Sequence, residues 1–111
     1  HDNRLIANEM APRVHNSGHW TNEGANISQF EAHIMAISDI KIPDIFTNNN
    51  SGMLNILSKM PDNIDENSDE YKLYDYGKSE RENRKLGHIT LTSENKKDLL
   101  SKISKLKDKI F

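Results

Sequence analysis

The sequence predicts an α+β fold of modest size. Two segments, residues 28–38 and 93–110, show the apolar spacing of amphipathic helices. Three short apolar runs between them, residues 53–57, 71–76 and 86–91, have the composition of strands. A chain of 111 residues is long enough for one small hydrophobic core. We therefore expect the helices and a small sheet to share a single core.

The first segment with a structural signal is residues 4–10 (RLIANEM), which predicts a strand. This strand is expected to end at Ala11 and Pro12, because the residue before a proline favours extended backbone and proline cannot donate to a sheet. Residues 13–27 are rich in Asn, Ser and Gly and predict a loop.

A helix is expected to follow this loop. Ser28 and Glu31 have the spacing of a capping box, and the apolar residues Phe30, Ile34 and Ile37 follow at helical intervals. The helix is predicted to end near Ser38, and the prolines and asparagines that come next predict a connector.

From residue 53 onward the apolar period changes to that of strands. Residues 53–57, 71–76 and 86–91 are the predicted strands, and in the third run Leu86, His88 and Thr90 alternate with Ile89 and Leu91. The acidic segment 61–70 contains few apolar residues and predicts a mobile surface excursion.

The last predicted element is an amphipathic helix for which Ser93 is the expected cap. Its apolar residues are expected on one face, with lysines on the others. This face is formed by Leu99, Leu100, Ile103, Leu106 and Ile110. The pattern favours a core or docking face over a membrane-surface helix.

Composition excludes several classes of protein. Fifteen basic and seventeen acidic residues give a net charge of −2, which does not support whole-molecule attraction to nucleic acid or to an anionic membrane. The absence of cysteine excludes disulfides and thiolate metal sites. No apolar run approaches the roughly 20 residues of a membrane span, and we expect a cytoplasmic protein. The low apolar content suggests either a lean core or a piece whose packing partner is missing, and the missing initiator Met suggests a piece of a longer chain.

Residues 8–20 (NEMAPRVHNSGHW) concentrate ionisable groups where no regular helix is expected. Glu9 and Arg13 could hold a divalent metal and an anionic oxygen side by side, as in phosphoryl transfer, although a surface ion pair explains them equally well. His15 and His19 have a zinc-ligand spacing, but a loop whose polar side chains satisfy their own backbone is the simpler interpretation. Trp20 is expected to pack this loop against the core.

Residues 76–88 (YGKSERENRKLGH) form a basic segment between two glycines. Its four cations suit a phosphate monoester, and they are Lys78, Arg81, Arg84 and Lys85. A solvated hairpin tip is the alternative, because Glu80 and Glu82 cancel half of this charge. His88 lies in an apolar run and is expected to be a core histidine.

Both motifs, together with SQFEAHIMAI and MLNIL, closely resemble the C-terminal end of the 5-(carboxyamino)imidazole ribonucleotide synthases over residues 5–91. These enzymes are the ATPase subunit of phosphoribosylaminoimidazole carboxylase in purine (IMP) biosynthesis. The resemblance implies an ATP-grasp ligase that uses magnesium and ATP to convert bicarbonate into carboxyphosphate. The carboxyl group is then transferred to the exocyclic amine of 5-aminoimidazole ribonucleotide.

The resemblance also implies roles for individual residues. Asn8 and Glu9 correspond to the ATP-binding end of the site, and Glu9 corresponds to one of two magnesium ligands. The catalytic residues implied next to bicarbonate, carboxyphosphate and the aminoimidazole are Arg13, His15 and Asn16. The residues implied to bind the ribonucleotide phosphate are Lys78, Arg81, Arg84 and Lys85. The acidic and basic motifs are accordingly expected to face one shared cavity.

Under this resemblance, residues 1–47 are the last strand, active-site loop and helix of an ATP-grasp domain. Residues 48–93 are a small β-rich C-terminal domain, and residues 94–111 are the amphipathic terminal helix. The parent enzyme is expected to be a homodimer. Glu82 and Asn83 replace the family's usual proline and small residue, so a looser loop with lower phosphate affinity is expected.

The other metal carboxylate and the nucleotide-clamping lysines of the family are not in this chain, which is therefore expected not to hydrolyse ATP alone. The alternative from another class is a non-catalytic interaction or dimerisation module, in which the basic segment and the terminal helix contact a partner.

Overall fold

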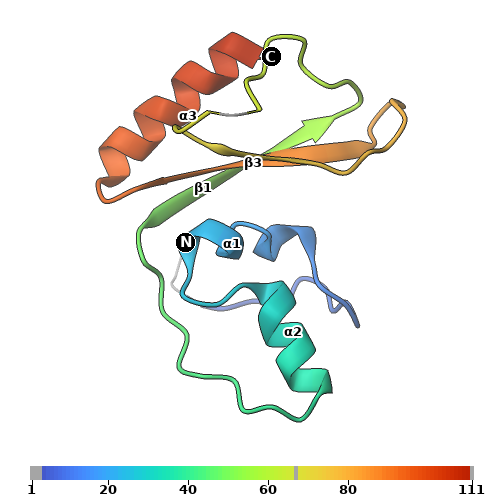
Figure 1. Ribbon diagram of the computed structural model, residues 1–111, viewed down its shortest axis with the longest axis vertical. Coiled ribbons are helices and arrows are strands. Elements are labelled where there is room, and N and C mark those ends of the chain that lie inside the picture. The colour runs from blue at the N-terminus through green and yellow to red at the C-terminus, as the bar shows by residue number, and fades with distance from the viewer. Residues whose placement is uncertain (1–3, 67, 111) are drawn as a thin grey trace.

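The computed structural model describes residues 4–66 and 68–110 and has the predicted α+β architecture (Figure 1). Its elements are, in chain order, a 3₁₀ turn η1 (Asn16–Gly18), α1 (Thr21–Gly24), α2 (Gln29–Ile37), β1 (Asn50–Leu57), β2 (Lys72–Asp75), β3 (Lys85–Ser93) and α3 (Lys96–Ile110). The sheet lies between α3 on one side and the N-terminal helices on the other (Figure 1).

The sheet is antiparallel with the strand order β1-β3-β2. Ile89 of β3 is the register partner of both Leu54 in β1 and Leu73 in β2. Gly87 lies opposite Asp75, and an added Cβ there would come 2.3 Å from the carbonyl oxygen of Tyr74, so only glycine allows β2 to approach this closely. The three predicted strands are therefore confirmed, with β3 in the centre.

The core forms where α3 packs on the sheet, and most of its buried residues come from β1, β3 and α3. They are Ile56 of β1, Tyr71 directly before β2, Leu86, Ile89 and Leu91 of β3, and Leu99 and Leu106 of α3, while Leu73 of β2 is partly buried against them. Because helices contact both faces of β3, every residue from position 86 to 91 is buried, including the polar His88 and Thr90. The alternation in this strand therefore separates two buried faces.

The terminal helix differs from the prediction in two details. Leu100 is 57% exposed and does not belong to the buried face, because it follows Leu99 by a rotation of about 100°. The cap is Asn95 rather than Ser93: its Oδ1 accepts hydrogen bonds from the N–H groups of Lys97 and Asp98. Ser93 lies two positions before this cap, where its Oγ accepts a hydrogen bond from the N–H of Asn95.

The predicted strand at residues 4–10 is wrong for this structure, in which these residues form neither helix nor strand. Leu5, Ile6 and Met10 are exposed. A strand needs a neighbour for its hydrogen bonds, and none of the described strands pairs with this segment. The predicted loop at residues 13–27 contains two short helical turns, whereas α2 begins at the predicted Ser28 cap, whose Oγ accepts from the N–H of Glu31.

Segment 61–70 has no helix or strand among its described residues, as predicted. Ile64 and the neighbouring Met60 nevertheless pack against the core, and the Tyr71 hydroxyl accepts a hydrogen bond from the N–H of Asp65. These contacts hold the segment at three places, and its mobility stays a prediction. Within the described part of the chain, no helix has the length and apolar character to cross a membrane.

Candidate functional site

The loop that carries Arg13, His15 and Asn16 is fixed by one side chain of α2, Gln29. Its Oε1 accepts from the N–H of His15 at 2.9 Å, and its Nε2 donates to the His15 carbonyl at 2.7 Å and to His19 Nδ1 at 2.5 Å. Gln29 thus binds the backbone of His15 on both sides. We call these contacts the Gln29 clamp. Because Ser28 caps α2, Gln29 is the first residue of the helix, and this sets the position of the clamp.

Thr21 and Gly18 complete this arrangement. The Thr21 hydroxyl donates to the Gly18 carbonyl at 2.6 Å and accepts from the N–H of Gln29 at 2.9 Å. A Cβ on Gly18 would lie 2.7 Å from Gln29 Oε1, whose position is set by its hydrogen bond to His15. The small residue at position 18 therefore leaves the space that the clamp needs.

His15 connects this loop to Glu9. Its Nε2 lies 2.8 Å from Glu9 Oε1, and its Nδ1 accepts from the N–H of Ser17 at 3.3 Å. Since Nδ1 is an acceptor, the ring carries its proton on Nε2 and donates it to the carboxylate. Within the described residues Glu9 thus pairs with His15, and the alternative of a Glu9–Arg13 surface pair is not seen.

Arg13 lies apart from this pair. Its Nη1 donates to the carbonyl of the adjacent Val14 at 3.0 Å, and its side chain lines a 390 Å³ cavity between the loop and α2, which His33 also lines. Arg13 therefore lines a different cavity from the one that Asn16 lines.

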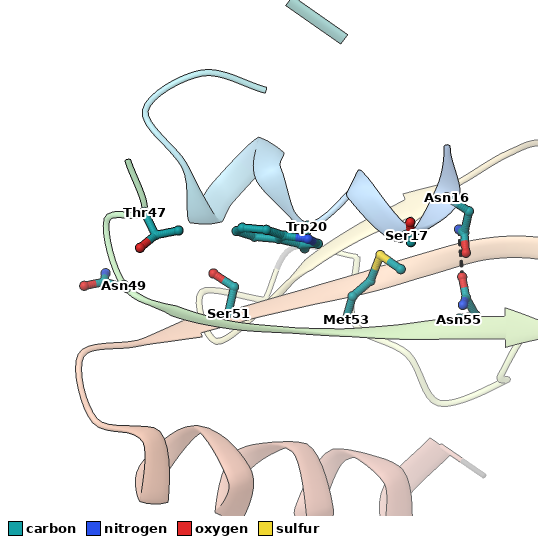
Figure 2. Close-up of a pocket in the computed structure, with 8 residues that line it drawn as sticks. All are labelled: Asn16, Ser17, Trp20, Thr47, Asn49, Ser51, Met53 and Asn55. Atoms are coloured by element: carbon teal, nitrogen blue, oxygen red, sulfur yellow. Dashed lines mark hydrogen bonds between the residues drawn. The ribbon is translucent and has the colours of Figure 1, made fainter. Parts of the chain in front are cut away.

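Asn16 joins the loop to the sheet (Figure 2). Its Nδ2 donates to Asn55 Oδ1 on β1 at 2.9 Å and to the Tyr76 hydroxyl at 3.5 Å. The Tyr76 hydroxyl lies 2.8 Å from Nδ1 of His88, a residue of β3. The first motif is thereby linked to the segment that begins the basic motif, 60 positions later in the chain.

His88 lies at the centre of an aromatic cluster. Its ring stacks on Tyr74 with centroids 4.6 Å apart and an angle of 7°, and it lies 5.2 Å from His19. Burial and the charge that His19 can carry lower the pKa of His88 from 6.5 to about 4, so the ring is neutral at pH 7. The expected core histidine is confirmed, and its Nε2 is buried without a partner among the described residues.

Lys85 brings the positive charge of the basic segment toward this cluster. The pKa of the His19 imidazole is lowered by burial first, and then by the charges of His15 and Lys85. Lys78 lies with its Nζ 5.0 Å from the centre of the Tyr76 ring, within cation–π range. Lys85 thus acts on a side chain of the first motif, and Lys78 lies close to Tyr76, which contacts that motif.

The remaining part of the basic segment is a structured turn. Arg84 Nη1 donates to Ser79 Oγ at 3.0 Å, and Asn83 has a positive φ of 59° while its N–H donates to Ser58 Oγ. Asparagine tolerates this left-handed conformation better than most side chains. Glu80 accepts from the N–H of Met60 and so points to the end of β1.

A cavity of 470 Å³ opens between the loop and β1. It is lined by uncharged residues: Asn16, Ser17, Trp20, Thr47, Asn49, Ser51, Met53 and Asn55. Figure 2 shows the indole of Trp20 lying over β1, opposite Ser51 and Met53, so Trp20 packs the loop against the sheet as predicted. None of the four predicted phosphate-binding cations lines this cavity. The expected single cavity shared by both motifs is not seen, and hydrogen bonds and close charges connect them instead.

The described residues contain no cluster of three or more histidine, aspartate or glutamate side chains that could bind a metal. His15 and His19 are directed to Glu9 and Gln29, so the zinc alternative has no third ligand here. Glu9 is a single carboxylate, whereas Mg²⁺ takes about six oxygen ligands. This donor set fits one contribution to a magnesium site and does not make a complete one.

Sequence reasoning missed three residues that organise the site: Gln29, Asn55 and Tyr76. Tyr76 could have been predicted, because it is the first residue of the basic motif and directly precedes its first glycine. The roles of Gln29 and Asn55 could not be predicted, since a single amide side chain in a helix or a strand is not part of any characteristic sequence pattern.

Two family models match the chain. The ATP-grasp domain matches residues 1–30, and the phosphoribosylaminoimidazole carboxylase C-terminal domain matches residues 51–102. The N5-carboxyaminoimidazole ribonucleotide synthase of Escherichia coli K12 is 44% identical over 107 residues, which cover 92% of this chain. The chain matches the C-terminal part of the N5-carboxyaminoimidazole ribonucleotide synthases. The resemblance seen in the sequence is therefore confirmed.

Solved structures of N5-carboxyaminoimidazole ribonucleotide synthases agree with this result. The Thermus thermophilus enzyme has a TM-score of 0.84 at 40% identity, covering 93% of this chain and 29% of that one. The Aspergillus clavatus synthase, in complex with ADP and 5-aminoimidazole ribonucleotide, has a TM-score of 0.75 at 35% identity, covering 86% and 28%. The chain spans about 29% of the length of the E. coli relative.

Proposed function

We propose that this chain contributes the C-terminal part of an ATP-dependent N5-carboxyaminoimidazole ribonucleotide synthase. The whole enzyme would carboxylate 5-aminoimidazole ribonucleotide with bicarbonate, through carboxyphosphate, in the cytoplasm. The observation that carries the proposal is the link from Asn16 to Tyr76, because it joins the ATP-grasp loop to the basic segment. The relatives' names and the ligands in the A. clavatus complex support the same reaction.

The basic segment is the proposed site for the ribonucleotide phosphate. The proposed phosphate ligands are Lys78, Arg81, Arg84 and Lys85. Glu80 accepts a hydrogen bond from the backbone of Met60 instead of pairing with these cations, which leaves their positive charge to bind a phosphate. Guanidinium and ammonium groups bind a phosphate dianion with charge-assisted hydrogen bonds, which are about twice as strong as neutral ones.

The loop is the proposed site of the reacting groups, with Arg13, His15 and Asn16 as catalytic residues. The Arg13 guanidinium can stabilise the negative charge that develops on carboxyphosphate. Asn8 and Glu9 are proposed to contact ATP and magnesium, with Glu9 as one metal ligand. One carboxylate does not hold this ion alone.

Calorimetric titration of the chain with 5-aminoimidazole ribonucleotide tests the phosphate site. Replacing Lys78 and Arg84 by Ala is expected to weaken binding by about 10-fold or more, because each charged hydrogen bond contributes about 1.5–3 kcal/mol. Lys78→Ala with Arg81→Ala tests the same site while keeping the Arg84–Ser79 contact. The matched control is Lys97→Ala with Lys107→Ala, which removes equal charge from α3. Equal affinity in all of these variants would contradict the proposal.

A second candidate, an interaction or dimerisation module, is favoured by the apolar side chains that α2 exposes. Phe30, Ile34 and Ile37 are 40%, 57% and 68% exposed. Sedimentation velocity distinguishes the two functions: a dimer that forms without nucleotide, together with no heat on titration with 5-aminoimidazole ribonucleotide, would favour the module.

A further inference from the structure

The amide of Asn16 offers different groups to its two surroundings. Its Nδ2 faces the protein, where it donates to Asn55 and Tyr76. Its Oδ1 accepts no hydrogen bond from the described residues, and the side chain lines the 470 Å³ cavity. If the amide turned by 180°, an N–H donor would replace this acceptor with almost no change in shape. The neighbours therefore decide which group a ligand meets.

Tyr76 is the neighbour that distinguishes the two orientations. Its hydroxyl has one hydrogen to donate, and the oxygen can accept others. When that hydrogen is donated to His88 Nδ1, 2.8 Å away, the oxygen is left to accept from Asn16 Nδ2. A turned amide would bring the Asn16 oxygen against the Tyr76 oxygen, and two acceptors repel each other. Asn55 also accepts from Asn16 Nδ2, at 2.9 Å, but its own side-chain amide could turn together with that of Asn16. The direction of the Tyr76–His88 hydrogen bond thus favours one orientation of the Asn16 amide.

His88 is well suited to hold this direction. It is 2% exposed in the central strand, and its stacking on Tyr74 keeps the ring from turning. As a neutral imidazole it has one acceptor nitrogen, and Nδ1 is the nitrogen that faces Tyr76. If Nδ1 accepts the hydrogen of Tyr76, the ring proton resides on Nε2, which is buried without a partner among the described residues.

We propose that His88 and Tyr76 are positioning residues that fix the Asn16 amide, and that Asn16 Oδ1 determines specificity for a ligand with an N–H donor. The inference rests on the proposed function, because the exocyclic amine of 5-aminoimidazole ribonucleotide is such a donor. Asn16 would accept from this amine and hold it at the cavity between the loop and β1.

The order of hydrogen bonds is tested first, without ligand. Nitrogen-15 NMR of the His88 ring is expected to show an unprotonated Nδ1 and a protonated Nε2. The opposite tautomer would overturn the proposal, because Tyr76 would then be free to donate to Asn16. This measurement uses the unaltered chain, so it does not depend on whether any variant folds.

Variants then separate positioning from simple packing. Tyr76→Phe is expected to shift the Asn16 side-chain amide resonances, whereas Tyr74→Phe keeps the stacking on His88 and is expected to leave them in place. His88→Asn retains an acceptor near the Nδ1 position and is expected to preserve the Asn16 resonances better than His88→Leu. Unchanged resonances in Tyr76→Phe, or equal effects of the two tyrosine variants, would refute the role of the hydroxyl.

Ligand specificity is measured by calorimetry with 5-aminoimidazole ribonucleotide and with imidazole ribonucleotide, which lacks the amine. The unaltered chain is expected to prefer the amine by about fivefold or more, and Tyr76→Phe is expected to reduce this preference toward one. Equal preference in both proteins would overturn the specificity role. Failure of both compounds to bind would instead contradict the proposed function, with the tautomer result still deciding the hydrogen-bond order.

Discussion

His88 shows how the surroundings of one side chain affect the stability of the whole chain. Tyr74 and His19 flank its ring, and Tyr76 occupies Nδ1. No carboxylate among the described residues compensates a positive charge on it, so protonation is unfavourable in the folded state. Folding therefore selects the neutral form.

Lowering the pH from 7 to 5 is expected to destabilise the chain by about 2 kcal/mol through His88 alone. The unfolded imidazole takes up a proton near its ordinary pKa of 6.5, whereas the folded one does so only near about 4. The contribution of His88 to the free energy of unfolding is thus fully present above pH 6.5 and is lost as the pH falls toward 4. Urea unfolding at several pH values measures this slope.

The control for this prediction is a comparison of two histidine variants. His88→Asn is expected to flatten the dependence on pH between 7 and 5, while His33→Asn, altered on α2 outside the cluster, is expected to retain it. An unaltered slope in His88→Asn would assign the pH dependence to other groups.

At the scale of elements, the loop and α2 behave as one unit because Gln29 binds the loop at three points. The sequence predicted the helix start, since capping by Ser28 is a local interaction between residues three apart. It did not predict the clamp, because the contact between Gln29 and His15 spans 14 positions and depends on the path of the chain between them.

Gln29→Met is expected to speed hydrogen exchange of the His15 amide by about tenfold or more. The substitution keeps the length of the side chain but removes its hydrogen bonds, each of which contributes about 1 kcal/mol. Gln29→Glu is the matched control, since it keeps an oxygen to accept from the N–H of His15. Equal exchange rates in the Met variant and the original chain would show that other contacts hold the loop.

The buried face of α3 can be tested with two adjacent leucines. Leu99→Ala is expected to lower the free energy of unfolding by about 2–5 kcal/mol, because it opens a cavity in the core. Leu100→Ala is expected to change it by less than about 0.5 kcal/mol, since this side chain is 57% exposed. Chemical denaturation measures both, and similar losses would place the helix in a different rotation about its axis.

At the scale of the whole molecule, the apolar residues divide into two groups. Those of the sheet and α3 form the core, whereas many from residues 4–46 are exposed. The prediction of a strand at residues 4–10 was wrong because an apolar, strand-like composition does not provide a neighbouring strand to pair with. The distances within the candidate site were equally beyond prediction, since Asn16 and Tyr76 meet only through the packing of the loop on the sheet.

Ile34→Glu with Ile37→Glu is expected to reduce the fluorescence of bound anilinonaphthalene sulfonate by about half or more, because this dye binds exposed apolar surface. Leu57→Glu with Leu100→Glu alters two exposed apolar residues elsewhere and is expected to have a smaller effect. A smaller loss in the α2 variant than in this control would mean that the dye binds mainly outside α2.

The central position of β3 has a consequence for the order in which the chain acquires structure during translation. β1 and β2 each take their described register partners from β3, which follows both of them in the sequence. The ribosome therefore releases β1 and β2 before any of this pairing is possible. Until residues 85–93 leave the exit tunnel, β1 and β2 lack these partners, so this sheet assembles late.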